Sequence, residues 1–268
     1  ALLIVNFLFV ESKAILVPVK ASNSISSNLG GYSSIAGLAG VRLPSNNNGN
    51  DVKAIKKIGS LSFFEKNILP NIHLPNLMAV KYWNSKTNTL VYNEKIYDSN
   101  SNTWIRDDSN IEQKIPSAQR SFAIFRPKLS IDEDVITSFV TISINHQSPF
   151  VAKQWTELVV NEVNNFYRQK DRLESEKAAS YLNQQILITS LSEVKEALVQ
   201  LLQEETKKLT LIEANNFYVF EYIDPPVVME TKSGPNRSLI CILITLFGGF
   251  LSVLLVLIRH YFLSKKGS

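Results

Sequence analysis

The sequence predicts an α+β protein in which a membrane-proximal α/β base domain carries a very long projecting helix. Three observations predict this fold class. Residues 238–258 form an apolar stretch without a single charge. Neither Gly nor Pro, the residues that interrupt helices, occurs from 150 to 224. Two β-like segments, 13–20 and 217–223, lie near opposite ends of the chain. Pairing them would close one domain near the membrane and leave the long helix projecting away from it.

The N-terminal segment 1–10 is almost wholly apolar but too short to cross a bilayer. It is compatible with the end of a first transmembrane helix, with a signal-peptide remnant or with a buried strand, and the residues alone leave these alternatives open. Residues 11–148 form the predicted base domain. It begins with the β-rich segment 13–20, in which Pro18 lacks an amide N–H and therefore suggests a sheet edge.

Within the base domain the pattern changes from helical to β-like. Asp51 is a plausible N-cap, and the apolar spacing after it predicts a helix that runs towards Ile68. A second short helix is expected around 77–83. The following segments are β-like, including 121–125 and, most regularly, 136–145, where apolar and polar residues alternate as in a half-buried strand.

A long helical region is predicted for 149–215, and Pro149 suits its first turn. If continuous, this helix would be about 100 Å long, so it must protrude or break into two. Apolar residues in its second half follow a 4-3-4-3 rhythm, which is a short heptad seam. They are Leu187, Leu191, Val194, Leu198 and Leu201. Such a stripe needs a partner, either another helix of this chain or a neighbouring subunit, and we expect at least part of it to pack in an oligomer.

The C-terminal part returns the chain to the membrane. Residues 216–237 are expected to form a returning strand and an extended linker, stiffened by Pro225, Pro226 and Pro235. The apolar stretch then covers about 30 Å as a helix, the thickness of a bilayer core. It predicts a transmembrane helix at 238–262.

Small residues lie in the middle of this predicted membrane helix, and the short segment 263–268 is expected to follow it as a cytoplasmic tail. Ser252 lies about one turn after Gly248 and Gly249, a spacing of small residues that lets two transmembrane helices approach closely. The single cysteine, Cys241, lies in the same stretch, which excludes an intramolecular disulfide and any metal site built on several cysteines.

No pattern in the sequence indicates catalysis. The three histidines, His73, His146 and His260, are far apart, and neither a phosphate loop nor a GxSxG motif occurs. The acidic clusters at 107–108 and 132–134 are interpreted as solvated turn residues. We therefore predict no catalytic, cofactor-binding or metal site. The net charge of +4 is scattered rather than gathered into a basic stripe, so no nucleic-acid partner is expected.

Three segments of the sequence resemble a known protein family. In their order along the chain, these segments are similar to Wzz-type polysaccharide co-polymerases, the polysaccharide chain-length determinants. They are SKAILVPV with LGGYSSIAGLAGVRLP, then VTISINHQSPFVAKQWTELVVNEVNNFYRQKD, with its Ser148–Pro149 step and Asn164, and finally YVFEYIDPPVVMETKSGPNRSLI before a Gly-Gly membrane helix. The resemblance covers essentially the whole chain, and its specificity lies in the series rather than in one motif.

The resemblance implies an inner-membrane protein with two transmembrane helices, the first represented by 1–10, and with most of the chain in the periplasm. It implies a ring-like homo-oligomer that sets the chain length of O-antigen (lipopolysaccharide) or a related polysaccharide. The implied partners are a Wzy-type polymerase and the polysaccharide chain or its lipid-linked precursor, and the protein itself would catalyse nothing. The sequence departs from the family pattern at 229–231, where another proline might be expected, and at Ser252, where the family often has Gly.

A second interpretation is the membrane adaptor of a tyrosine autokinase in capsule or exopolysaccharide export. Because the sequence lacks a phosphate loop, we expect no kinase in this chain, whereas an adaptor for a separate kinase stays open. A periplasmic polysaccharide-processing enzyme is a third, less favoured interpretation.

Overall fold

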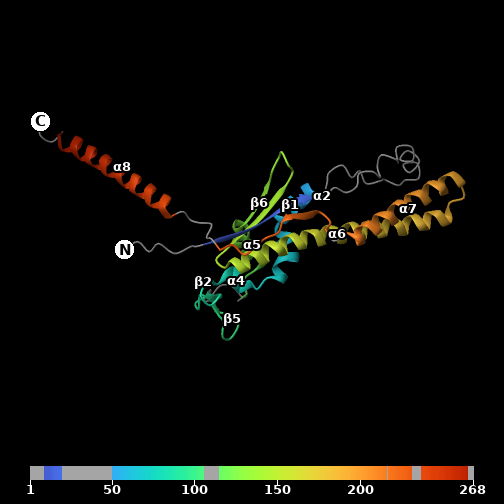
Figure 1. Cartoon of the computed structure of the whole chain (residues 1–268), viewed down its shortest axis with the longest axis horizontal. Coiled ribbons are helices and arrows are strands. Elements are labelled where there is room, and N and C mark those ends of the chain that lie inside the picture. Colours follow the sequence, from blue (N-terminus) through green and yellow to red (C-terminus); the bar gives the residue numbers. More distant parts are fainter. Residues whose placement is uncertain (1–8, 20–49, 106–114, 216, 231–236, 265–268) are drawn as a thin grey trace.

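The computed structural model describes residues 9–19, 50–105, 115–215, 217–230 and 237–264 of the 268 in the sequence. It shows an α+β base domain from which a long helical hairpin projects on one side (Figure 1). A further helix, α8, stands on the opposite side of the base domain in the same view. The α/β base with a long projecting helical element agrees with the predicted fold class.

The base domain is built around a four-stranded antiparallel sheet in the order β6-β7-β1-β8. Its strands are β1 (Val10–Pro18), β6 (Leu129–Glu133), β7 (Val140–His146) and β8 (Phe220–Asp224). The first and last strands pair, as the sequence predicts. However, β1 lies inside the sheet, so the edge position inferred from its proline is wrong. The sheet tolerates that residue because it is the last one of the strand.

One face of the sheet is buried, and the apolar residues of β7 alternate onto it as the sequence predicts. Val140, Ile142 and Ile144 are fully buried, together with Ala14 and Leu16 of β1. The N-terminal half of the long helix α6 lies against this face. It contributes the buried residues Val151, Trp155, Val159, Val160, Val163 and Tyr167 to the same core.

The helix expected from Asp51 towards Ile68 is interrupted. It consists of α2 (Asn50–Ile58), the short α3 (Leu61–Phe63) and a π-helical turn, η1 (Phe64–Ile68). Gly59 and Ser60 lie between α2 and α3, where Ser60 caps α3 by accepting a hydrogen bond from Phe63 N. Since glycine and a serine cap both favour a helix boundary, the break has a local cause.

The second short helix ends earlier than expected, and two β-hairpins follow it. After η2 (Leu69–Asn71), α4 covers only Leu74–Met78, so Val80 and Trp83 lie in strand β2. Two small hairpins follow. They are β2 (Val80–Asn84) with β3 (Thr89–Tyr92), and β4 (Tyr97–Asp98) with β5 (Thr103–Trp104).

The segment 121–125, expected as a strand, belongs to α5 (Ala118–Phe125), which continues into the turn η3 (Arg126–Lys128). The side chain of Ser117 accepts from Arg120 N and caps this helix. Phe125 packs on Phe64 with a ring-centroid distance of 4.9 Å and on Trp155 at 6.0 Å. Burial of an apolar side on these aromatic neighbours outweighs the β preference of its residues.

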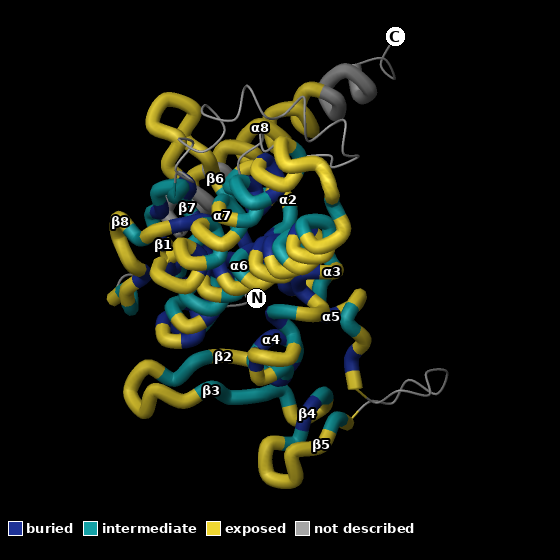
Figure 2. Tube along the Cα trace, turned by 90° about the vertical axis from the view of Figure 1, so that its right-hand side faces the viewer, coloured by how far each residue is buried: buried dark blue, intermediate teal, exposed yellow. Residues whose placement is uncertain are grey.

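The region 149–215 breaks into two antiparallel helices. Helix α6 (Pro149–Ile188) has 40 residues, about 60 Å, and α7 (Ser192–Ala214) has 23 residues, about 35 Å. The first part of α6 covers the sheet, and its second part runs beside α7 as a projecting hairpin (Figure 1). Figure 2 shows the same hairpin nearly end-on, with exposed residues around its outer surface.

Helix α8 (Arg237–Ser264) includes the predicted transmembrane segment. In the described part of the chain, no helix combines the length and apolar character needed to cross a membrane. The transmembrane helix expected at 238–262 is therefore not confirmed and stays a prediction. At the other end, residues 1–8 lie outside the described residues, and Val10 already belongs to β1, where it pairs with His146.

Candidate interaction surfaces

The root of the hairpin is fixed to the sheet by Asn164, a buried residue of α6. Its side-chain oxygen accepts from the backbone N–H of Val219 at 2.7 Å and of Phe220 at 2.9 Å. Its side-chain nitrogen donates to the carbonyl of Phe220 at 3.0 Å. One amide side chain thus pairs with both polar groups of Phe220, as a neighbouring strand would. This contact closes the outer edge of β8 at that residue.

A second set of polar contacts centres on Asp171, seven residues after Asn164 on α6. The Asp171 carboxylate accepts from the Tyr218 hydroxyl at 2.6 Å and from the Asn50 side chain at 2.7 Å. Burial and this hydrogen bond hold the pKa of Tyr218 far above its ordinary value, so Tyr218 remains a donor. On the exposed side, Arg172 contacts Glu213 at 3.0 Å.

The sequence analysis noted Asn164 only as part of the family resemblance and did not single out Asp171, although a signal for a buried polar residue exists. Val163, Tyr167 and Asp171 are spaced by four residues and lie on one buried face of α6. A carboxylate on such a face requires partners, because an unpaired buried charge is costly. Together, Asn164 and Asp171 join α6 to α2 and to the segment leading into β8, and so set the direction in which the hairpin leaves the base domain.

The middle of the hairpin has a small core of its own. Leu182 of α6 packs against Leu198 and Leu201 of α7, and all three are buried. Val194 is partly buried against the same cluster. Three residues of the predicted stripe therefore have their partner within this chain, which was one of the two alternatives for it.

The tip of the hairpin is apolar and exposed. Leu187 at the end of α6 is 83% exposed, Ile188 is 74% exposed, and Leu191 in the connection is 62% exposed. No residue from Ala178 to Ser192 carries a charge. The predicted heptad seam is not one continuous stripe, because α6 ends at Ile188 and Thr189 turns to an extended backbone. Its first two members point away from any packing that is described, while its last three lie inside the hairpin.

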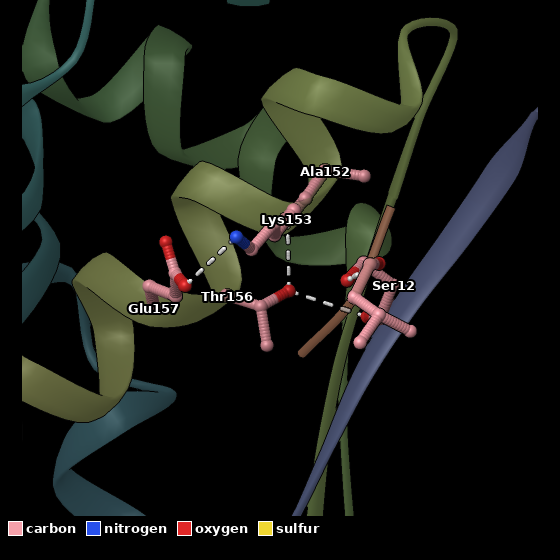
Figure 3. Close-up of polar contacts among 6 residues, drawn as sticks. Ser12, Ala152, Lys153, Thr156 and Glu157 are labelled. Carbon is pink, nitrogen blue, oxygen red and sulfur yellow. Dashed lines mark hydrogen bonds and ion pairs between the residues drawn. The ribbon is translucent and has the colours of Figure 1, made fainter. Parts of the chain in front are cut away.

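The start of α6 and the chain after β8 meet at β1 (Figure 3). The Thr156 hydroxyl lies 3.2 Å from the carbonyl of Ser12 and 2.8 Å from that of Ala152. The Ser12 hydroxyl donates to the carbonyl of Val227 at 3.0 Å. The segment after β8 is therefore held on β1. Of the predicted linker prolines, Pro225 is exposed, Pro226 is buried, and Pro235 lies outside the described residues.

The small residues predicted for helix packing lie on α8. A Cβ added at Gly248 or Gly249 would meet nothing within 4 Å, and the Ser252 hydroxyl donates to the carbonyl of Gly249 at 2.8 Å. Described apolar side chains around them are exposed, including Leu246 and Phe250. This face of α8 is exposed. A partner helix for it is part of the function proposed below.

The histidines His73 and His146 make contacts within the base domain. His146 is buried; its Nδ1 accepts from Ser148 N at 3.0 Å and its Nε2 lies 2.9 Å from Asn76 O, which assigns the proton to Nε2. Burial lowers the pKa of His146 to about 4, so the ring is neutral. His73 lies among the rings of Tyr92 and Tyr97.

No grouping of three or more His, Cys, Asp or Glu suited to a metal ion occurs among the described residues. Of the acidic clusters, 107–108 lies outside those residues, and Asp132–Asp134 lies at the exposed end of β6.

Comparison with known proteins gives structural neighbours only. No family model matches the sequence, and no curated protein matches it. Among solved structures, a full-length bacterial polysaccharide co-polymerase matches with a TM-score of 0.35 and 15% identity, covering 97% of this chain and 89% of that one. A fragment of WzzB, the polysaccharide co-polymerase from Salmonella Typhimurium, matches with a TM-score of 0.33 and 13% identity, covering 85% of this chain and all of that one.

The chain is thus structurally similar to Wzz polysaccharide co-polymerases over nearly its full length, at low sequence identity.

Proposed function

We propose that this chain is a non-catalytic regulator of the chain length of O-antigen or a related surface polysaccharide. It acts as an oligomeric scaffold in the bacterial inner membrane, beside a Wzy-type polymerase and the growing polysaccharide or its lipid-linked precursor. Most of the chain lies in the periplasm, and membrane helices flank it on both sides.

One observation carries the proposal. The first and last strands of the base domain are neighbours, since Leu16 pairs with Tyr222 and Pro18 with Phe220. The start of β1 and the end of β8 therefore lie at the same end of the sheet, while the hairpin of α6 and α7 projects from the base domain on the side opposite to α8 (Figure 1). This arrangement is suited to a protein held at both ends in one membrane that reaches outward from it.

The two open apolar surfaces support an oligomer. The tip residues Leu187 and Leu191 contact the neighbouring subunit, whereas Leu198 and Leu201 hold each hairpin together. At the membrane, Gly248, Gly249 and Ser252 let α8 approach another helix closely. Because each tip exposes only a few side chains, a single contact is weak, and repetition around a ring makes it effective.

The test is the lipopolysaccharide ladder on a gel from cells that lack the gene and cells that carry it. We expect loss of the preferred chain length without the gene, and restoration by the wild-type chain. The double variant Leu187→Asp and Leu191→Asp should broaden the distribution. The matched control, Asn183→Asp with Gln184→Asp, adds the same charge at exposed polar positions of α6 and should leave it unchanged.

An unchanged ladder in cells without the gene would refute the proposed function. If the amount of capsule and the phosphorylation of a separate tyrosine kinase changed instead, the adaptor interpretation would replace it.

A further inference from the structure

The loop between β6 and β7 presents two apolar side chains to solvent. Val135 is 92% exposed and Ile136 is 94% exposed, the highest values among the described large apolar residues. The loop is held in shape by Asp134, whose side chain accepts from Ile136 N at 2.8 Å and from Thr137 N at 3.3 Å. Ser138 closes it with a positive φ of 59° and a 2.7 Å bond from its N–H to Asp134 O. A fixed apolar knob, Val135 and Ile136, results.

An apolar pocket lies elsewhere on the same base domain. It has a volume of about 390 Å³ and is lined mainly by Val10, Trp83, Phe150 and Met229, with Glu230 as a single carboxylate. The Trp83 ring is held by a 3.0 Å bond from its Nε1 to Asn88 and packs at 6.4 Å from Phe150. The pocket is therefore formed before anything enters it, and its size is in the range of binding pockets for small apolar groups.

The knob and the pocket lie on different sides of the molecule. In both views the β6–β7 hairpin lies above α6 and strand β2, which carries Trp83, lies below it (Figures 1 and 2). Within one chain they do not meet. Two complementary features at different places on one surface make a head-to-tail contact, and such contacts generate rings when the rotation closes.

We propose that Val135 and Ile136 of one subunit insert into the pocket formed by Val10, Trp83, Phe150 and Met229 of the next copy of this chain. This inference deepens the proposed function, on which it rests for the existence of an oligomer. It specifies how the base domains of neighbouring subunits contact each other. The contacts proposed above for the hairpin tips and for α8 do not involve the base domain.

The chemistry favours a protein partner for the knob over a membrane surface. Asp132, Glu133 and Asp134 precede it directly, and the hydrogen bonds to Asp134 keep the pKa of that carboxyl below its ordinary value. Three carboxylates beside the knob disfavour an anionic lipid surface. In the proposed contact these three carboxylates lie near the N-terminal end of α6, which favours negative charge. The carboxylate of Glu230 repels them. The apolar side chains therefore drive the contact.

The test uses disulfide cross-linking of the full chain in membranes, in a Cys241→Ser background that has no other thiol. Val135→Cys and Glu230→Cys are placed at the knob and the pocket rim, so that Ile136 and Phe150 remain. With both cysteines on one chain, oxidation should give a ladder of dimers, trimers and larger species. Coexpression of the two single variants should give mainly dimers, and each single variant alone should give none.

Two controls make the result specific. The pair Val52→Cys with Glu230→Cys uses a half-exposed valine on α2 and should give no ladder. Ile136→Asp should reduce cross-linking of the knob–pocket pair by about tenfold or more, since a carboxylate is poorly tolerated in an apolar pocket. Val52→Asp should leave it unchanged.

Native sizing of the same membranes separates the two levels of the proposal. An oligomer without a cross-linked ladder, or with strong cross-linking of Val135→Cys alone, would overturn the knob–pocket contact and leave the scaffold function standing. A monomer would overturn both the contact and the oligomeric scaffold.

Discussion

Replacement of Asn164 by alanine tests whether one side chain fixes the hairpin to the base domain. The change removes two short hydrogen bonds to Val219 N and Phe220 N and one to Phe220 O, all of them buried. A buried polar group left without a partner costs about 1–3 kcal/mol. Alanine returns up to about 0.7 kcal/mol through its higher helix propensity. For the three backbone groups left without a partner, we expect a net loss of at least about 2 kcal/mol in the free energy of unfolding.

The matched control is Asn165→Ala, the same substitution at the next residue of α6, whose side chain is exposed. We expect a change within about 0.5 kcal/mol there. Urea unfolding followed by far-UV circular dichroism gives both values. Trp155 lies in the core, so its fluorescence reports the base domain separately. A loss below about 1 kcal/mol for Asn164→Ala, or one equal to that of the control, would show that β8 is held by β1 alone.

Other outcomes follow from the remaining contacts. His146 has a pKa of about 4, below its ordinary 6.5, so the unfolded chain binds more protons between these values, and stability should fall by up to roughly 3 kcal/mol as the pH drops through this window. Urea unfolding as a function of pH should show a shallower fall for His146→Gln, and equal slopes would contradict this. Leu198→Ala should cost about 2–5 kcal/mol, whereas Leu191→Ala should stay within about 0.5 kcal/mol in thermal unfolding. Equal losses would contradict the assignment of Leu198 to the hairpin interior. A cytoplasm-specific reporter fused after Ser268 should be active, and activity of a periplasm-specific one there would overturn the proposed topology.

Three of the four strands, β1, β7 and β8, were predictable from the sequence because their signals are local and periodic, whereas β6 was not among the predicted strands. The alternation around Val140, Ile142 and Ile144 identifies the inner face of β7, and the order of segments identifies β1 and β8 as partners. The edge position assigned to Pro18 failed because a proline at the end of a strand is tolerated inside a sheet. That distinction depends on where the strand stops, which periodicity does not fix.

The strand predicted at 121–125 was wrong for a different reason. Its aromatic and β-branched residues favour a strand, but Ser117 caps a helix and Phe64 and Trp155 offer it an aromatic surface. These neighbours are distant in sequence, so no window around the segment contains them.

The break of the long helix has a weak local signal, since neither Gly nor Pro occurs at 189–191. Packing of Leu182 on Leu198 and Leu201 determines that the chain folds back there. The heptad rhythm is present in the sequence, but three of its five residues, Val194, Leu198 and Leu201, pack inside the hairpin. Asn164 and Asp171 became interpretable only when their partners around Tyr218 and Phe220 were brought beside α6.

The pairing of β1 with β8 also has a consequence for the order in which the protein folds. The hairpin of α6 and α7 consists of contacts between residues close in sequence, and such elements form early. The sheet, in contrast, is complete only when residues near Phe220 reach a strand that was synthesised first. A hairpin formed beforehand shortens the chain segment that must be closed, because Asn164 and Asn215 already lie near each other through Arg168, which donates to Asn215 O at 2.7 Å. A chain that has emerged only as far as α7 therefore exposes the side of β1 that β8 later covers. During synthesis, the chain is most open to wrong strand pairing while this sheet is incomplete, and the pairing of β8 with β1 ends that stage.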